Sequence, residues 1–139
     1  MKTNGAPRDL SERRDPELLR LWNTAKHVVY EDKEKRYNVF DVYQLMSTMP
    51  CNGFYVGDET AWRYIMARRR GKTPQLKSKY KRMLYEKLYA IVMELRTEAR
   101  YAHMSTKTLM YKAMNYRAPC IGLSPARIRS EIERLHYTT

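Results

Sequence analysis

The sequence predicts an all-α protein of about six helices, arranged as two degenerate three-helix units that pack as one domain. Apolar residues recur at helical spacing in six stretches, and most of these stretches follow a residue type that starts helices. The two halves also match. Aligning the Pro-Cys pairs at 50–51 and 119–120 superimposes Gly53 on Gly122 and, after a two-residue gap at 54–55, continues into the next helix. The two glycines are therefore expected to occupy equivalent turns.

The predicted domain organisation is a polar arm followed by one folded domain. Residues 1–14 are expected to form a flexible N-terminal arm, and residues 15–139 a single helical domain. Within that domain, the two three-helix units are expected at about 15–72 and 75–139.

The first unit begins with two helices that carry clear start signals. Asp15 followed by Pro16 supplies an N-cap and a proline at the first helical position, so the first helix is predicted to run from there to about Tyr30. Asn38 caps the second helix, which Pro50 ends because proline cannot sit in a helix interior.

The third helix of this unit is predicted to start at Asp58 and to end in the basic run 68–71, which closes with glycine. Residues 54–56 form either a short extended piece or a true strand. Trp22 and Trp62 each lie on an apolar helical stripe and are expected to be core residues.

The second unit repeats this plan with a longer first helix. Its apolar stripe predicts a helix from Leu76 to Ala102. Ser105 is the expected N-cap of the next helix, and Ser124 followed by Pro125 is the expected start of the last one.

The composition favours a folded domain and offers no sign of membrane insertion. The chain has 139 residues, of which 43% are hydrophobic, enough to build a core. No apolar run approaches the roughly 20 residues of a membrane span, and the N-terminus lacks the apolar region of a signal peptide. We therefore expect the protein in the cytoplasm.

The charge is strongly positive and concentrated in one tract. Lys and Arg number 27 against 15 Asp and Glu, which gives a net charge of +12. Residues 63–87 hold ten of the basic residues and a single acid, Glu86. Such a tract is typical either of a solvated helix face or of a surface that binds nucleic-acid phosphates. The residues predicted to contact phosphates are Arg63, Arg68, Arg69, Arg70, Lys72, Lys77, Lys79, Lys81 and Arg82.

The sequence contains no pattern that predicts catalysis, a cofactor or a metal. It has no nucleotide-binding glycine loop, no nucleophile elbow and no paired zinc-ligand spacing. Cys51 and Cys120 could in principle join three histidines around zinc or form a disulfide, but their spacing and the missing secretion signal favour small, partly buried thiols in the turns after the prolines. We expect no enzyme activity, no cofactor and no catalytic residues.

The stretches P-C-N-G-F-Y-V-G-D-E-T-A and P-C-I-G-L-S-P-A resemble a repeated P-A-P-R-F-Y-[VI]-S-x-x-x-A motif. That motif belongs to small hypothetical proteins of bacteriophages and mobile elements in gut anaerobes. Asn52-Gly53 and Ile121-Gly122 replace its second proline and arginine. The resemblance implies a phage or mobile-element origin and carries no catalytic residues. We therefore expect a protein of the host-cell cytoplasm, with association with the virion as the alternative.

Two functions remain open from the sequence. The first is a non-enzymatic protein that binds the backbone of DNA or RNA through residues 63–87. The second is an accessory or assembly subunit, such as an enzyme's partner protein or a virion component, which would use Tyr- and Met-rich surfaces to contact a protein partner or a second copy of itself.

Overall fold

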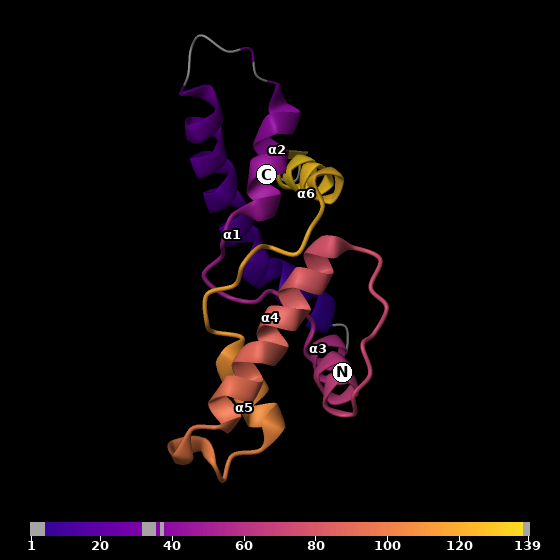
Figure 1. The fold of residues 1–139 in the computed structure, drawn as a ribbon. Helices are drawn as coiled ribbons and strands as arrows, with labels where there is room; N and C mark the ends of the chain where they lie inside the picture. The colour runs from indigo at the N-terminus through magenta and orange to yellow at the C-terminus, as the bar shows by residue number, and fades with distance from the viewer. Residues whose placement is uncertain (1–4, 32–35, 37, 138–139) are drawn as a thin grey trace.

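Six α-helices and one short 3₁₀ helix make up the fold (Figure 1). The structure is a computed structural model that describes residues 5–31, 36 and 38–137, with side chains from 10 to 136 within those ranges. The elements are α1 (Gly5–Tyr30), α2 (Val39–Thr48), α3 (Asp58–Arg69), α4 (Lys79–Arg96), η1 (Ala99–Tyr101), α5 (Thr106–Ala113) and α6 (Pro125–Tyr137).

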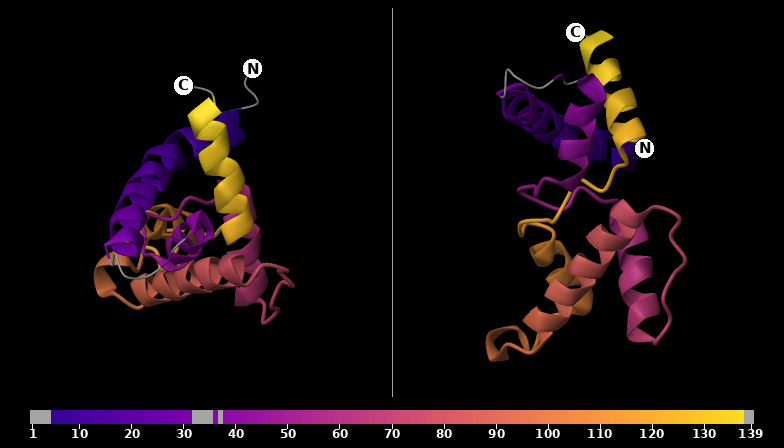
Figure 2. Two further views of the ribbon diagram at one scale, coloured as in Figure 1. Left: turned by 90° about the horizontal axis from the view of Figure 1, so that it is seen from above. Right: turned by 45° about the horizontal axis from the view of Figure 1, so that its top comes forward.

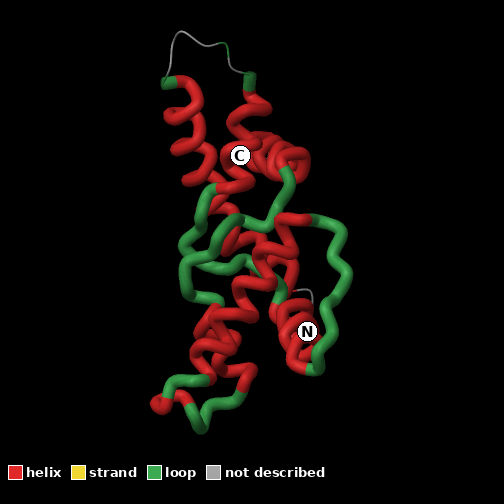
Figure 3. Tube along the Cα trace, viewed as in Figure 1, coloured by secondary structure: helices red, strands yellow, loops and turns green. Residues whose placement is uncertain are grey.

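The predicted fold class is confirmed, because the described residues form an all-helical, compact single domain with no strand (Figure 3). Residues 54–56, for which a strand was one possibility, are irregular.

The contacts divide the helices into two groups. One consists of α1, α2 and α6, and the other of α3, α4 and α5 together with η1. The first group occupies most of the upper part of Figure 1 and the second the lower part, and the turned views in Figure 2 show the same division.

This grouping differs from the units predicted at 15–72 and 75–139. The last helix of each predicted unit packs in the other group: α6 lies on α1 and α2, whereas α3 lies on α4. An apolar stripe shows which face of a helix is buried but does not name the helix that covers it.

Two connecting segments cross between the groups, one from α2 to α3 and one from α5 to α6 (Figure 3). They are joined where they cross. Cys51 and Ala118 form an antiparallel bridge in which each backbone N–H donates to the other's carbonyl oxygen at 2.9 Å. The Phe54 N–H donates to the carbonyl of Met114, also at 2.9 Å.

The two halves correspond in register along their whole helical part. The same sequence spacing separates Cys51 from Ala118 and the N-cap residues Asn38 from Ser105. No gap is needed, so the two-residue gap of the sequence alignment is wrong. At this spacing, buried residues coincide in the pairs Val42 and Leu109, Tyr43 and Met110, Met46 and Ala113, Phe54 and Ile121, Val56 and Leu123, Ala61 and Ile128, and Ile65 and Ile132.

The prediction that Gly53 and Gly122 occupy equivalent turns is also wrong. Gly122 has φ of +83°, in the left-handed region, and Gly53 does not. A Cβ atom at Gly122 would lie 2.5 Å from Cδ2 of Leu84, a fully buried side chain. Gly122 is therefore required both by its backbone conformation and by its close contact with α4.

The start of α1 is a further correction. The helix begins at Gly5 rather than at Asp15 and continues through Pro16, so residues 5–14 are helical and not part of a flexible arm; residues 1–4 lie outside the described residues. Contacts made within the fold hold the helix together around the proline. Arg14 pairs with Glu131 at 3.2 Å, and Asp15 pairs with Arg134 at 2.7 Å.

The other predicted helix starts agree with the structure. Asn38 forms a capping box with Asp41, Ser105 accepts the N–H of Thr108, and α3 and α6 begin at Asp58 and Pro125. The exception is α4, predicted from Leu76 to Ala102. It begins after Ser78, which accepts the N–H of Lys81, and it ends at Arg96. The chain then turns through η1, which buries Tyr101.

Both tryptophans lie at the edge of the core rather than inside it. Trp22 and Trp62 are partly buried and pack against the core cluster. Lys26 Nζ lies 3.5 Å from the ring centroid of Trp22, and Lys107 Nζ lies 5.6 Å from that of Trp62. The expectation that both are core residues is wrong because each side chain is only partly buried.

We predict that Gly122→Ala destabilises the fold by about 2–4 kcal/mol, and Gly71→Ala by only about 1 kcal/mol. Both glycines have φ of +83°, but a Cβ at Gly71 would meet no atom within 4 Å. The pair therefore separates the backbone cost from the clash with Leu84. Urea unfolding monitored by circular dichroism measures both, and equal losses would show that Leu84 moves aside freely.

We also predict that the two halves depend on each other for folding. Fragments 1–72 and 73–139, produced separately, should be largely unfolded, because each presents its third helix without the group on which that helix packs. Mixing them should restore helical circular dichroism and a one-to-one complex in light scattering. A fragment that unfolds cooperatively as a monomer would contradict this dependence.

Candidate nucleic-acid interface

Because α3 packs on α4 and α6 packs on α1 and α2, the positive charge is concentrated in one of the two groups of helices. Residues 58–117, which include α3, α4 and α5, hold 15 of the 27 basic residues but only five of the 15 acidic ones. The remaining residues are nearly balanced. Almost all of the net charge of +12 therefore belongs to the α3/α4/α5 group.

Four of the nine predicted contact residues are either paired with a carboxylate, bound to backbone carbonyls or partly buried. Arg63 pairs with Glu59 at 3.1 Å. Arg82 donates to the backbone carbonyls of residues 76 and 77 and so holds the end of the α3–α4 connection. Lys81 is partly buried, and Arg68 is bound by a carboxylate.

Arg68 is part of the packing between α3 and α4. Its Nε and one terminal nitrogen donate to the two oxygens of Glu86 at 2.6 and 3.2 Å, and its guanidinium lies 4.7 Å from the ring centroid of Tyr89. The buried Tyr64 hydroxyl donates to the same carboxylate. These hydrogen bonds, that of Arg68 first, lower the pKa of Glu86 despite its partial burial. Burial and then Glu86 raise the pKa of Tyr64 to about 12. Arg68 is thus not available as a surface contact.

The other five predicted residues, Arg69, Arg70, Lys72, Lys77 and Lys79, are exposed, and none of them contacts a carboxylate of the described residues. Arg69, Arg70 and Lys72 follow the end of α3, where a left-handed Gly71 closes the helix: the N–H of Lys72 donates to the carbonyl of Ala67 at 2.9 Å. We call these five residues the basic surface.

Two arginines meet at the start of α5. Arg69 donates to the hydroxyl of Thr106 at 2.9 Å, and Arg96 donates to the same oxygen at 2.6 Å and to the carbonyl of Met104 at 2.7 Å. One neutral hydroxyl thus holds two guanidinium groups side by side, with no described carboxylate in contact with either. We refer to Arg69 and Arg96 as the arginine pair. Bringing two like charges together is unfavourable unless an anion or solvent screens them.

The sequence interpretation missed Arg96 because this residue lies outside the basic tract 63–87, between Glu94 and Glu98. Arg96 ends α4, where the turn toward η1 directs it to Thr106. Lys107 and Lys112 on α5 are two further exposed cations that it did not include. The hydrogen bonds of Arg69 and Arg96 to Thr106 join residues that are separated in the chain, and no local sequence pattern indicates them.

The cations lie at both ends of α4 and on the α3–α4 connection. The arginine pair lies at the C-terminal end of the helix, Lys77 and Lys79 at its start, and Lys72 on the connection that runs between these ends (Figure 1). An 18-residue helix is about 27 Å long. At 3.4 Å per base pair, that length covers about eight base pairs of duplex.

The tyrosines of the tract do not form a stacking platform. Tyr64 and Tyr85 are buried and stack on each other, with ring centroids 5.4 Å apart. Tyr80 and Tyr89 are partly buried against the core. Interactions of this surface with a ligand would therefore be mainly electrostatic.

Metal ligands and reactive thiols would be two other kinds of chemical site among the described residues. No group of three or more His, Cys, Asp or Glu residues that could hold a metal ion occurs among the described residues. Cys51 and Cys120 are free thiols that are fully buried rather than partly buried as predicted, and burial raises the pKa of both, that of Cys51 to about 12. Such thiols are poor nucleophiles.

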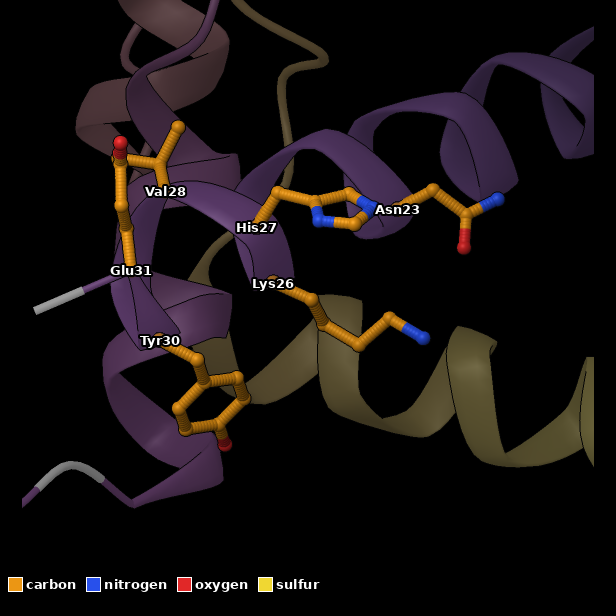
Figure 4. Close-up of a pocket in the computed structure, with 6 residues that line it drawn as sticks. All are labelled: Asn23, Lys26, His27, Val28, Tyr30 and Glu31. Carbon is orange, nitrogen blue, oxygen red and sulfur yellow. The ribbon is translucent and has the colours of Figure 1, made fainter. Parts of the chain in front are cut away.

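One surface hollow is lined by Asn23, Lys26, His27, Val28, Tyr30 and Glu31, which come from α1 and the residue that follows it (Figure 4). These side chains do not converge on a common point. Among the described helices, none is long and apolar enough to cross a membrane.

No protein-family model, curated protein or solved structure matches this chain.

We predict that Arg68→Gln lowers the melting temperature and that Arg70→Gln does not, because only Arg68 binds a carboxylate. The pKa of Glu86 is lowered in the folded state, so the stability it contributes is present above its unfolded value of 4.5 and is lost as the pH falls through the folded value. The difference between wild type and Arg68→Gln should therefore shrink in acid. A difference that stays constant from pH 7 to pH 3 in thermal melts would assign the effect to the stacking on Tyr89 instead.

Proposed function

We propose that the protein binds the phosphate backbone of a nucleic acid through the basic surface and the arginine pair, without catalysing a reaction. The observation that supports this most directly is the arginine pair, in which two guanidinium groups share one hydroxyl and no described carboxylate contacts either. A phosphate at this position would replace like-charge repulsion by charge-assisted hydrogen bonds.

The distribution of charge supports the same proposal. A cationic group of helices attracts a polyanion from a distance and gains affinity by releasing its counterions. The basic surface carries cations at both ends of α4, so that several phosphates along one backbone would be contacted together. Contacts of this kind position a nucleic acid but do not read its sequence.

A second candidate function is supported by a different part of the molecule. Val28, Val39 and Phe40 are exposed where α1 ends and α2 begins. At the corresponding positions of the other half, Leu95 and Thr106 are buried. An uncovered apolar end is what an accessory or assembly subunit would use to contact a protein. Light scattering without nucleic acid separates the candidates, because a defined oligomer favours assembly and a monomer favours nucleic-acid binding.

We predict that Arg69→Gln together with Arg70→Gln weakens binding to unrelated DNA or RNA sequences to a similar degree. Both side chains are exposed and neither contacts a described carboxylate, so the fold should be retained. Each phosphate contact contributes a slope of about −0.9 in log K against log salt for duplex DNA, so losing two contacts should flatten the slope by roughly two. Fluorescence anisotropy over a salt series measures both quantities.

The matched control is Arg36→Gln together with Arg129→Gln, which removes the same charge from exposed positions outside the α3/α4/α5 group. It should change the slope little. Equal effects of the two double variants would show that only the net charge matters and would remove the basic surface as the site. Absence of binding to both DNA and RNA at low salt would refute the proposed function itself.

A further inference from the structure

A second group of cations lies inside the joint between the two groups of helices. Arg14 on α1 is 8% exposed, and its Nε is buried without a hydrogen-bond acceptor. One of its terminal nitrogens lies 3.2 Å from Glu131 on α6. A buried donor without an acceptor is destabilising, more so when it is charged, so this position favours a ligand that can accept a hydrogen bond.

The carboxylate in this joint is shared among several cations. Glu131 also forms ion pairs with Arg134 at 2.8 Å and, at a longer distance, with Arg127 at 3.5 Å. Asp15 contributes a second negative charge through Arg134. The joint thus holds two carboxylates and three guanidinium groups, in addition to Lys81. The carboxylates are those of Asp15 and Glu131, and the guanidinium groups are those of Arg14, Arg127 and Arg134.

Lys81 adds a further positive charge at the start of α4. It is partly buried, and it makes no hydrogen bond or ion pair with a carboxylate of the described residues. Burial, and then the positive charges of Arg14 and Arg127, lower the pKa of Lys81. The thiol of Cys120 raises the pKa of Lys81, which is the smallest of these effects.

The two helices that start at this joint both carry positively charged side chains in their first turn. The first residues of α4 and α6 lie close together in Figures 1 and 2. Neither helix has an acidic residue in its first turn, and Lys81 and Arg127 lie there instead. The start of a helix favours anions, so cations there are unfavourable without a counter-charge. In contrast, α3 begins with Asp58 and Glu59.

We propose that Arg14, Lys81 and Arg127 form a binding site for a single phosphate group at the joint of α1, α4 and α6. The phosphate oxygens accept from the free Arg14 Nε and from the Lys81 ammonium and offset the repulsion between them. Arg127, whose side chain is largely exposed, closes the site from the solvent side. This site is separate from the basic surface and does not require the protein to bind nucleic acid.

The test uses the full-length protein and inorganic phosphate as the probe. Melting temperatures are measured at pH 7 in increasing sodium phosphate and in sodium chloride of matched ionic strength. Wild type should gain stability in phosphate along a saturating curve, as expected for a ligand that binds the folded state alone. A gain no larger than that in chloride would overturn the proposal.

Lys81→Gln is the informative variant, because Lys81 supports no ion pair whose loss would unfold the protein. It should weaken phosphate binding about tenfold or more, the effect of losing one charge-assisted hydrogen bond. Lys81→Arg should retain most of the binding. The matched control, Lys87→Gln, removes an exposed charge from the same helix and should behave like wild type. Unchanged phosphate binding in Lys81→Gln would refute the site.

Competition distinguishes the sources of the phosphate. A 5′-phosphorylated oligonucleotide that displaces inorganic phosphate, where the same oligonucleotide with a 5′-hydroxyl does not, identifies a nucleic-acid end as the ligand. Displacement by both identifies a backbone phosphate, and displacement by neither identifies a small free phosphate. Failure of the proposed nucleic-acid function would leave the inorganic phosphate result intact.

Discussion

The pairing of Cys51 with Ala118 is the constraint on which the arrangement of the helices depends. Both residues are buried, so their backbone N–H and C=O groups have no access to water and must find partners inside the protein. They find them in each other, at 2.9 Å in both directions. Pro50 and Pro119 favour this geometry, since a proline cannot continue a helix and biases the residue before it toward an extended conformation. Once the two segments are joined there, α3 and α6 are directed to opposite groups.

The distribution of charge follows from this crossing. Because α6 packs on α1, the carboxylate of Glu131 pairs with Arg14 there. Because α3 packs on α4, its terminal arginines join an already basic helix, and Glu86 neutralises only Arg68. Contiguous three-helix units would have placed the acids of α6 beside α4 and mixed the charges. The strongly cationic group is therefore a consequence of topology as well as of composition.

Local chemistry made most helix starts predictable, and contacts across the fold account for the rest. Asn38, Ser105 and Ser124 cap helices through neighbours within three residues, which a sequence displays directly. The start of α1 depends on Arg14 meeting a carboxylate near the other end of the chain, so Pro16 gave the wrong boundary. The same distinction holds at the candidate site. The exposure of Arg70 and Lys72 followed from their position after a helix, whereas the binding of Arg68 by Glu86 and of Arg96 by Thr106 arises only when α3, α4 and α5 come together.

The two places where cations meet differ in their access to water, and this sets what each can do. The arginine pair lies at the surface, where solvent and salt screen the repulsion, so its attraction for an anion is long-ranged, additive with the other exposed cations and weakened by salt. Arg14 and Lys81 lie in the joint, where screening is weaker and an unmatched charge costs more. An anion there would be held by directed hydrogen bonds at a single position, with less sensitivity to salt. It would also join α1, α4 and α6, and so connect the two groups of helices that the crossing segments hold together.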